Sequence, residues 1–406
     1  MQIKIKLIME ELYEIFYKEL KQTDLSFERY LAKEIDWEGK LSAITGARGT
    51  GKTTMIFQHI KKKFGNTPKE ALYVSADNIR FSGNKLFDLA LEFEKYGGKY
   101  LFIDEIHKYE NWPQEIKNIY DSIGSLKVVI TGSSVLQIFK GNADLSRRAV
   151  HYSMNGMSFR EFINFEQKSH FDKVSLEEII NNHSEIASSV NEKIKPLPLF
   201  KSYLNYGYYP FYKTDKRFYL SKLANVINLI LETDIPAVES IEVYTIRKLK
   251  KLLWIISQSV PFTPNISKLA SDLEVSRNSL LNYLTILEQA GLINLLVTNT
   301  KGLNSLAKPE KIYLNNTNQI YSLASNAPNI GNLRETFFFN QLQAVAEVNS
   351  SPNADFTINK QYTFEIGGKN KGHEQISKTP DAYLALDDIE YGFGKKIPLW
   401  LFGLMY

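Results

Sequence analysis

The chain has 406 residues, of which 44% are hydrophobic and 23% charged, as in folded globular proteins too long for one ordinary domain. Its net charge of +4 is small for this length and excludes a uniformly basic nucleic-acid-binding protein, so any such contact needs a local patch. The absence of cysteine excludes disulfides, cysteine-ligated zinc and iron–sulfur clusters.

Residues 1–38 predict an N-terminal helical segment. Charged residues interrupt the apolar ones from the start, and Glu10 and Glu11 follow, so we expect no signal peptide. The longest apolar stretch, 397–406, is too short to span a bilayer. The expected location is therefore the cytoplasm.

The most informative stretch is 46–53, Gly-Ala-Arg-Gly-Thr-Gly-Lys-Thr, which lies between a predicted buried strand at 41–45 and a predicted helix at 55–60. In this context the backbone N–H groups of a glycine-rich loop bind phosphates, Lys52 reaches the β- and γ-phosphates and Thr53 binds Mg²⁺. A glycine-rich turn that contains Lys-Thr by chance is the alternative. We expect ATP to be bound by this loop, through Gly46, Ala47, Arg48, Gly49, Thr50, Gly51, Lys52, Thr53 and Thr54.

Three more apolar runs predict strands at 71–75, 100–105 and 127–131. The second ends in Asp104, a candidate Mg²⁺ ligand, and Glu105, a candidate for polarising the attacking water. A solvated acidic strand end is the alternative. The third leads into Gly132, Ser133 and Ser134, and in a parallel sheet its end lies between the other two sites. Thr131 or Ser133 is then placed to contact the γ-phosphate or the water, and the residues do not choose between them.

Strands that alternate with helical segments predict right-handed crossovers and a doubly wound α/β sheet. Beyond the strands, Arg147 and Arg148 are candidates for stabilising charge on the transferred phosphoryl group, within the chain or across a subunit boundary. An ordinary surface pair that binds an acid or a helix end is the alternative.

The order of these motifs resembles the ASCE branch of P-loop ATPases, and more closely the AAA+ group. Several stretches resemble a prokaryotic subset whose ATPase domain is followed by a C-terminal domain of unassigned function. The resemblance implies that Lys52, Thr53, Asp104 and Glu105 carry the nucleotide chemistry and that Arg147 or Arg148 acts in trans. It leaves a homo-oligomer open and supplies no substrate. The matching stretches are 103–108, 131–134, 144–148, 157–162, 204–210 and 331–335.

Residues 166–258 predict a helical lid or linker with a break at 195–198. The aromatic run at 203–212 indicates a core that packs against the ATPase sheet, with base stacking as the alternative. The basic run at 245–251 indicates a solvated helix face.

Residues 259–305 predict a winged helix-turn-helix, with helices at 266–273 and 276–290 and a strand after Gly291. Ser276 is the expected N-cap of the second helix. Arg277, Asn278 and Asn282 are the side chains placed to contact double-stranded DNA in a major groove. A rigid spacer or a protein-contact module is the alternative.

Residues 306–406 predict strands at 311–314, 355–359 and 362–366 with a helix at 333–348 between the first two, an order that resembles the core of PD-(D/E)xK nucleases. The resemblance implies acidic positions at Glu335, Asp355 and Glu365 that hold Mg²⁺. The chain departs from that pattern because Gly367 stands where the lysine belongs, and Lys369 comes two residues later. We expect a nuclease-like fold without cleavage activity.

The sequence as a whole predicts an α/β protein with a P-loop NTPase parallel sheet in an AAA+ ATPase core, 39–165, followed by the three segments above. We expect a Mg²⁺-dependent ATPase whose nucleotide state controls distal domains that contact DNA or a protein partner. The alternatives are a slow nucleotide switch or scaffold without DNA binding, and an ATP-regulated DNA nuclease.

Overall fold

A computed structural model describes residues 2–82, 85–133, 145, 147–238, 241–258, 261–298, 308–324, 327–372 and 374–406. The chain folds into two compact units. Unit 1 comprises residues up to 155 together with 233–240, and unit 2 comprises 156–232 together with 241–406. The chain therefore leaves unit 1, returns to it for a short segment, and leaves it again.

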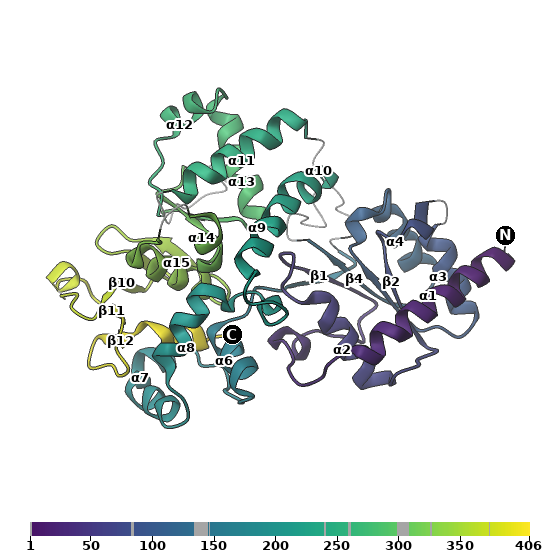
Figure 1. Ribbon diagram of the computed structural model, residues 1–406, viewed down its shortest axis with the longest axis horizontal. Coiled ribbons are helices and arrows are strands. Elements are labelled where there is room, and N and C mark those ends of the chain that lie inside the picture. The colour runs from purple at the N-terminus through teal and green to yellow at the C-terminus, as the bar shows by residue number, and fades with distance from the viewer. Residues whose placement is uncertain are drawn as a thin grey trace. The chain divides into compact units, whose positions relative to one another are not determined.

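Unit 1 is built on a parallel sheet with the strand order β2-β3-β4-β1-β5 (Figure 1). Four of its strands confirm the predicted apolar runs. The fifth, β5, has only four residues and exposes most of them, so it carries no apolar run that predicts a strand. The strands are β1 (Leu41–Thr45), β2 (Ala71–Ser75), β3 (Tyr100–Asp104), β4 (Lys127–Gly132) and β5 (Val150–Ser153).

Helices cover both faces of this sheet. The step from β1 to β2 runs across the sheet in the opposite direction to the steps from β2 to β3 and β4. Right-handed crossovers therefore place α2 on one face and α3 and α4 on the other. Helix α1 contacts β2, α2 and α3 at the sheet edge (Figure 1). The helices are α1 (Gln2–Gln22), α2 (Lys52–Phe64), α3 (Leu86–Lys95), α4 (Trp112–Ser122) and α10 (Ile235–Val238).

The strand order places β4 directly between β1, which precedes the phosphate loop, and β3, which ends in the two acids. Ile44 of β1 pairs with Thr131, and Ile103 of β3 pairs with Ile130. Because parallel strands end at the same edge of a sheet, the loop, the acids and the end of β4 meet there. This confirms the predicted position of the third polar strand end.

The segment between α1 and β1 makes hydrogen bonds to the phosphate loop and to the helix that follows it. The buried Arg29 guanidinium donates hydrogen bonds to the carbonyl oxygens of Thr50 in the loop and of Asn155 after β5, the latter at 2.8 Å. The amide of Gln58 in α2 donates to the carbonyls of Asp24 and Phe27 at 2.8 and 2.7 Å. One arginine thus joins the loop to two other parts of unit 1.

Unit 2 begins with helices, as the sequence predicts for 166–258. The break predicted at 195–198 was placed too late, because α7 ends at Asn191 and α8 already begins at Pro196, a residue that fits the first turn of a helix. Two helices at 266–272 and 277–289 confirm the predicted pair of the helix-turn-helix within one residue at each end. The helices are α6 (Phe159–Gln167), α7 (Leu176–Asn191), α8 (Pro196–Ser202), α9 (Tyr219–Leu229), α11 (Val243–Ser257), α12 (Ile266–Asp272), α13 (Arg277–Gln289), α14 (Thr317–Leu323) and α15 (Ile330–Leu342).

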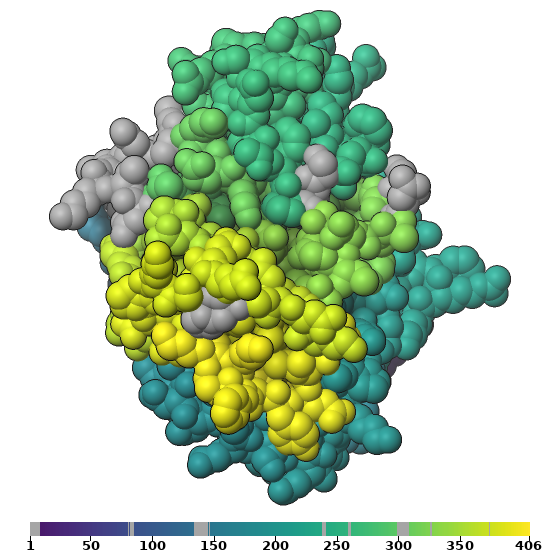
Figure 2. Space-filling view, turned by 90° about the vertical axis from the view of Figure 1, so that its left-hand side faces the viewer, coloured from purple at the N-terminus to yellow at the C-terminus, as the bar shows by residue number. Residues whose placement is uncertain are grey.

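Two sheets complete unit 2. In the smaller, β6 (Ile293–Leu296) pairs antiparallel with β7 (Lys311–Leu314), so the strand at 311–314 joins the strand that follows the helix-turn-helix. The larger has the order β12-β11-β10-β9-β8. Within unit 2 its strands (yellow) lie between α11–α13 and α7 (Figure 2). They are β8 (Val348–Ser350), β9 (Phe356–Ile358), β10 (Tyr362–Gly368), β11 (Ala382–Asp387) and β12 (Lys396–Pro398).

The aromatic run at 203–212 lies in the core of unit 2. Tyr203 and Tyr212 are buried, and their rings contact Phe162 of α6; Tyr203 also contacts Phe337 of α15 at a centroid distance of 5.9 Å. The prediction of a core that packs against the ATPase sheet was therefore wrong about the partner. The apolar faces of α6 and α15 lie far away in the sequence and carry no local mark of their pairing.

Among the described residues, no helix is both long and apolar enough to cross a membrane.

Candidate nucleotide-binding site

The phosphate loop depends on glycine at three positions. Gly49 and Gly51 have φ values of 86° and 97°, a region that residues with a side chain rarely adopt. A Cβ on Gly46 would lie 2.4 Å from the carbonyl oxygen of Met154, just beyond β5. The backbone of this loop therefore takes a course that bulkier residues would not follow, and it opens directly into α2.

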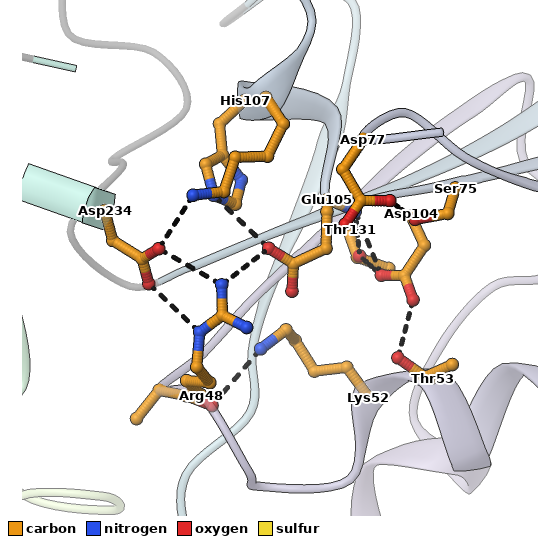
Figure 3. Close-up of polar contacts among 12 residues, drawn as sticks. Arg48, Lys52, Thr53, Ser75, Asp77, Asp104, Glu105, His107, Thr131 and Asp234 are labelled. Atoms are coloured by element: carbon orange, nitrogen blue, oxygen red, sulfur yellow. Dashed lines mark hydrogen bonds and ion pairs between the residues drawn. The ribbon is translucent and has the colours of Figure 1, made fainter. Parts of the chain in front are cut away.

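Lys52 lies against the carbonyl oxygens of its own loop. Its ammonium donates hydrogen bonds to Gly46 O at 2.6 Å and Ala47 O at 3.2 Å (Figure 3). Burial lowers the pKa of Lys52 from its usual value. A buried ammonium held by neutral carbonyls gains strongly when an anion enters the loop, because the new partner is charged. The geometry fits the predicted phosphate contact.

Asp104 and Thr53 meet where the sequence places the Mg²⁺ ligands. The Thr53 hydroxyl donates to Asp104 Oδ2 at 2.5 Å (Figure 3). The Tyr73 hydroxyl donates to the same oxygen at 2.8 Å. Carboxylate and hydroxyl oxygens suit a hard cation such as Mg²⁺, so this pair fits the ion that the resemblance implies. Tyr73 in β2 was not among the predicted site residues, because its strand reads only as a buried apolar run.

Thr131 and Ser133 take different positions at the end of β4. The Thr131 hydroxyl donates to Asp104 Oδ1, and the backbone N–H of Glu105 donates to Thr131 Oγ1 at 3.3 Å. The Ser133 hydroxyl is buried and has no hydrogen-bond partner within the described part of the chain. Thr131 thus orients the two acids, and Ser133 is left with an unused hydroxyl. Ser134 lies outside the described residues.

Glu105 directly follows β3 in a left-handed conformation, with φ of 52°. Burial raises the pKa of its carboxyl above the usual value. Its Oε2 lies 3.5 Å from Arg48 Nη2 and 3.3 Å from His107 Nε2 (Figure 3). Burial lowers the pKa of His107 to about 4, so this imidazole is neutral near pH 7 and Arg48 supplies the positive charge.

Asp234 is another site residue that the sequence did not predict. It ends a π-helical turn, Ile230–Asp234, and its carboxylate is fully buried. Arg48 contacts it through Nε at 3.3 Å and Nη2 at 3.1 Å (Figure 3). Lys108 Nζ lies 3.1 Å from Oδ1. Asp234 belongs to no sequence motif, and it lies 186 positions after its partner Arg48. A single aspartate at that distance has no spacing from which the contact could be predicted.

Arg147 and Arg148 lie away from the phosphate loop of their own chain. They precede β5, whose first residue, Val150, pairs with Ser42 of β1, whereas the loop follows the other end of β1. Arg148 contacts Asp121 of α4 through Nε at 3.1 Å and Nη2 at 3.2 Å. Arg147 is exposed. The strand direction therefore separates both guanidinium groups from the nucleotide site within one chain.

The three predicted nuclease-like acids do come together in unit 2, with lysines among them. Lys311 Nζ lies 3.1 Å from Glu335 Oε2 and 3.3 Å from Asp355 Oδ1, and Lys371 Nζ lies 2.5 Å from Glu365 Oε1. Burial, together with the Asp355 charge, raises the pKa of Glu335. These five residues are called the acid–lysine cluster below.

The lysine on Glu365 is Lys371, and not Lys369, the first lysine after Gly367. A Cβ on Gly367 would lie 2.6 Å from Lys371 Cβ and 2.7 Å from its Cγ. The Lys371 side chain thus occupies the space that a residue 367 side chain would fill. The hydrogen bond from Lys371 to Glu365 raises the pKa of Lys371.

Arg277, Asn278 and Asn282 lie on α13, and all three are exposed. Ser276 caps this helix, as predicted, because its hydroxyl accepts a hydrogen bond from the backbone N–H of Ser279 at 3.0 Å.

The basic run at 245–251 was predicted to be a solvated helix face, but two of its lysines make hydrogen bonds to another helix. Lys248 donates to the Leu273 carbonyl at 2.5 Å and Lys251 to that of Asp272 at 2.7 Å, so α11 binds the C-terminal end of α12.

Residues 38–163 match a family model described as an AAA domain. The match covers the phosphate loop, Asp104, Glu105 and β5, the parts that form the site just described. This part of the chain is therefore similar to AAA domains, and the similarity supports an ATPase. Residues 197–329 match a second model, described as a domain of unknown function (DUF8612).

Two uncharacterized proteins of Methanocaldococcus jannaschii are similar to this chain. One is 28% identical over 269 residues, which cover 63% of this chain and 56% of the relative. The other is 26% identical over 353 residues, which cover 83% of this chain and 74% of the relative. The chain thus spans little more than half the length of the first, and neither description states an activity.

Two solved structures show a weaker likeness. The S. cerevisiae Hsp104–ADP complex has 17% sequence identity and a TM-score of 0.31, over 66% of this chain and 42% of that chain. A variant of RuvB from Thermotoga maritima has 16% identity and a TM-score of 0.29, over 69% of this chain and 88% of that chain. Both TM-scores lie below 0.5.

Proposed function

We propose that the chain binds ATP with Mg²⁺ and hydrolyses it. The observation that carries the proposal is the convergence of Lys52, Thr53, Asp104 and Glu105 at one sheet edge, each with the side chain that its role needs. Lys52 and the loop N–H groups bind the β- and γ-phosphates, and Thr53 and Asp104 hold Mg²⁺, which neutralises charge on the phosphates. Glu105 orients the attacking water and accepts its proton.

The contacts of Glu105 lead us to expect slow turnover. Its carboxylate is engaged by Arg48 at 3.5 Å and lies beside neutral His107. Burial raises the pKa of Glu105, and the Arg48 charge acts against that rise because it stabilises the ionised carboxylate. The contact also occupies the carboxylate oxygen that would have to orient the water. We infer that Glu105 polarises water only after Arg48 moves away from it.

The test measures ATP binding and ATP hydrolysis by three purified forms of the chain. Lys52→Ala is expected to abolish both, because the loop loses its only described side-chain ammonium. Glu105→Gln is expected to bind ATP like the wild type and to hydrolyse it about 100-fold more slowly or worse.

The matched control is Lys62→Ala, which removes an exposed lysine from the same helix, α2, far from the phosphates. It is expected to leave both quantities unchanged. Wild-type turnover in the Glu105→Gln protein would show that Glu105 does not position the water.

We further propose that nucleotide state controls unit 2 and thereby its contact with DNA or with a protein partner. The support is the chain route, since residues 233–240 belong to unit 1 while both flanking stretches belong to unit 2. Duplex DNA is the first partner to test, because α13 exposes Arg277, Asn278 and Asn282. ATP hydrolysis is measured with and without duplex DNA. If duplex DNA stimulates ATP hydrolysis in the wild type but not in Lys52→Ala, the result supports a link between the nucleotide site and DNA binding. If DNA does not change the rate of hydrolysis, the result favours a switch that binds a protein.

The acid–lysine cluster gives no support to the nuclease alternative. Carboxylates would suit a divalent cation, but here the ammonium groups of Lys311 and Lys371 lie on the oxygens of all three acids. No group of three or more possible metal ligands of the His, Cys, Asp or Glu type occurs among the described residues. The cluster in this form does not fit Mg²⁺, and we propose a structural or binding role for it. DNA cleavage that requires Mg²⁺ or Mn²⁺ and is lost in Glu365→Ala would contradict this.

A further inference from the structure

The Asp234 carboxylate is both buried and charged. Burial alone would raise its pKa, but the hydrogen bonds from Arg48 and Lys108 outweigh that effect and hold the pKa below its usual value. A charge that is fully buried requires partners of opposite charge, because transfer out of water is costly. The two contacts from Arg48 and the one from Lys108 supply them.

The route of the chain gives this contact a second property. Helix α9 belongs to unit 2, and it continues through the π-helical turn at 230–234 into α10 of unit 1. π-helical turns often mark functional positions in helices. Any change in how Asp234 is held therefore acts on a backbone that leads directly into α9.

Arg48 serves two acids with one side chain. Its Nη2 lies 3.1 Å from Asp234 Oδ1 and 3.5 Å from Glu105 Oε2. Asp234 makes the two-point contact and thereby fixes the plane of the guanidinium, and Glu105 accepts from the same nitrogen. Since Arg48 itself belongs to the phosphate loop, it stands beside the place where a triphosphate ends.

We propose that Asp234 is a positioning residue of the nucleotide site: it holds Arg48 on Glu105 until the terminal phosphate of a nucleoside triphosphate competes for the same guanidinium. When ATP binds, its terminal phosphate takes Arg48 away from both acids. Glu105 is then free to act on water, and the segment that carries Asp234 is held less tightly. ADP lacks that phosphate and leaves the contact in place. The inference rests on the proposed function and adds the residue that distinguishes the two nucleotides.

A purely structural role predicts something different. If Asp234 only fastened its segment to unit 1, replacing it would lower stability and change the affinities for ATP and ADP by the same factor. A positioning role changes the ratio of the two affinities, because only ATP has to displace Arg48. The ratio is therefore the quantity to measure.

The experiment compares four forms of the full chain: wild type, Asp234→Asn, Asp234→Glu and Glu232→Gln. Asp234→Asn keeps the size of the side chain and removes its charge, and Asp234→Glu restores the charge. Glu232 is the matched control, because it lies in the same turn but is exposed and pairs with Lys250 instead. Dissociation constants for ADP and for a non-hydrolysable ATP analogue are measured with Mg²⁺, together with kcat and KM for ATP.

We expect Asp234→Asn to favour the ATP analogue over ADP by roughly fivefold or more relative to wild type. Asp234→Glu is expected to restore most of the wild-type ratio, and Glu232→Gln to leave it unchanged. The same ratio in Asp234→Asn and in the control would overturn the proposal.

Hydrogen exchange over 230–238 in the wild-type protein supplies a measurement that needs no variant. Exchange is expected to be faster with the ATP analogue than with ADP, and equal exchange would contradict the proposal even if Asp234→Asn failed to fold. Failure of the wild type to bind ATP would instead refute the proposed function itself, which separates the two failures.

Discussion

At the scale of single residues, the nucleotide site is a set of close contacts with little free space. Gly46 shows this most directly, because its Cα approaches the backbone after β5 so closely that a methyl group has no room. Arg29 adds a second constraint through its hydrogen bond to the Thr50 carbonyl. The loop is therefore shaped before any phosphate arrives, which lowers the ordering cost of binding.

Gly46→Ala is expected to lower the stability of unit 1 by about 1–3 kcal/mol, the usual range for inserting a methyl group into a packed site. Its Cβ would lie 2.4 Å from the Met154 carbonyl oxygen, and the loop or β5 has to shift. Thermal unfolding with and without ATP measures both the loss of stability and the loss of binding. Gly124→Ala is the control, since a Cβ there meets nothing within 4 Å. An equal unfolding temperature in the two variants would refute the proposed close packing.

How far sequence alone predicts the site depends on where its residues lie. Lys52 and Thr53 belong to one short loop, and Asp104 and Glu105 end an apolar strand, so local pattern suffices for all four. Asp234 is invisible to the same reasoning, because its partner Arg48 is reached only through the tertiary fold. Lys371 was missed for a related reason. The chain turns back after Gly367, so that the Lys371 side chain fills the space beside that glycine. The spacing of residues in the sequence does not predict this turn.

At the scale of elements, the best-predicted parts are those with a strong period or a strong cap. β1, β3 and β4 are continuous apolar runs, and α13 has both an N-cap serine and an apolar face. The pairing of elements was harder to predict. β7 pairs with β6, and the aromatic run packs on α6 and α15, because complementarity of buried faces is decided across the whole chain.

Helix α13 is the element on which the DNA proposal can be tested. Arg277→Ala is expected to weaken binding of duplex DNA and to reduce the salt dependence by about one counterion, because one phosphate contact is lost. Affinity is measured at several salt concentrations, with Lys378→Ala as a control that removes an exposed lysine between β10 and β11. Equal affinities and equal salt slopes in the two variants would show that α13 does not contact DNA, and α13 would then serve as a packing or protein-contact element.

At the scale of the whole molecule, the division into units does not follow consecutive segments of the sequence. The predicted ATPase core ended at residue 165, whereas unit 1 ends at Asn155 and regains 233–240 later. A prediction that divides the sequence into consecutive domains cannot assign a later segment to an earlier domain. The return is also what brings Asp234 to the phosphate loop.

The strand direction in unit 1 leads to a prediction about assembly. Because Arg147 precedes β5, at the edge opposite the phosphate loop, it is expected to act only on the nucleotide of a second copy of the chain. Arg147→Ala is then expected to bind ATP normally and to lose on the order of 1,000-fold in turnover. Mixing it with Lys52→Ala is expected to restore part of the activity, since each protein supplies what the other lacks.

Two controls belong to that experiment. Arg148→Ala loses its contact with Asp121 and is expected to lose at most about 1 kcal/mol of stability, as is usual for an exposed ion pair. Turnover per subunit is also followed against protein concentration. Wild-type turnover in Arg147→Ala, or a rate independent of concentration together with no recovery on mixing, would show that Arg147 does not act across subunits.

The contacts of Tyr406 have a consequence for how the chain is made. Its carbonyl accepts hydrogen bonds from Ser158 and Arg160, and its hydroxyl donates to the Gly156 carbonyl, 250 positions earlier. At roughly 5–20 residues per second, a ribosome needs on the order of 10–50 s to connect these ends. Throughout that interval the apolar face of α6 is already synthesised and lacks its final cover. Unit 2 is therefore expected to need chaperones during synthesis, whereas unit 1 is complete once residue 240 has been made.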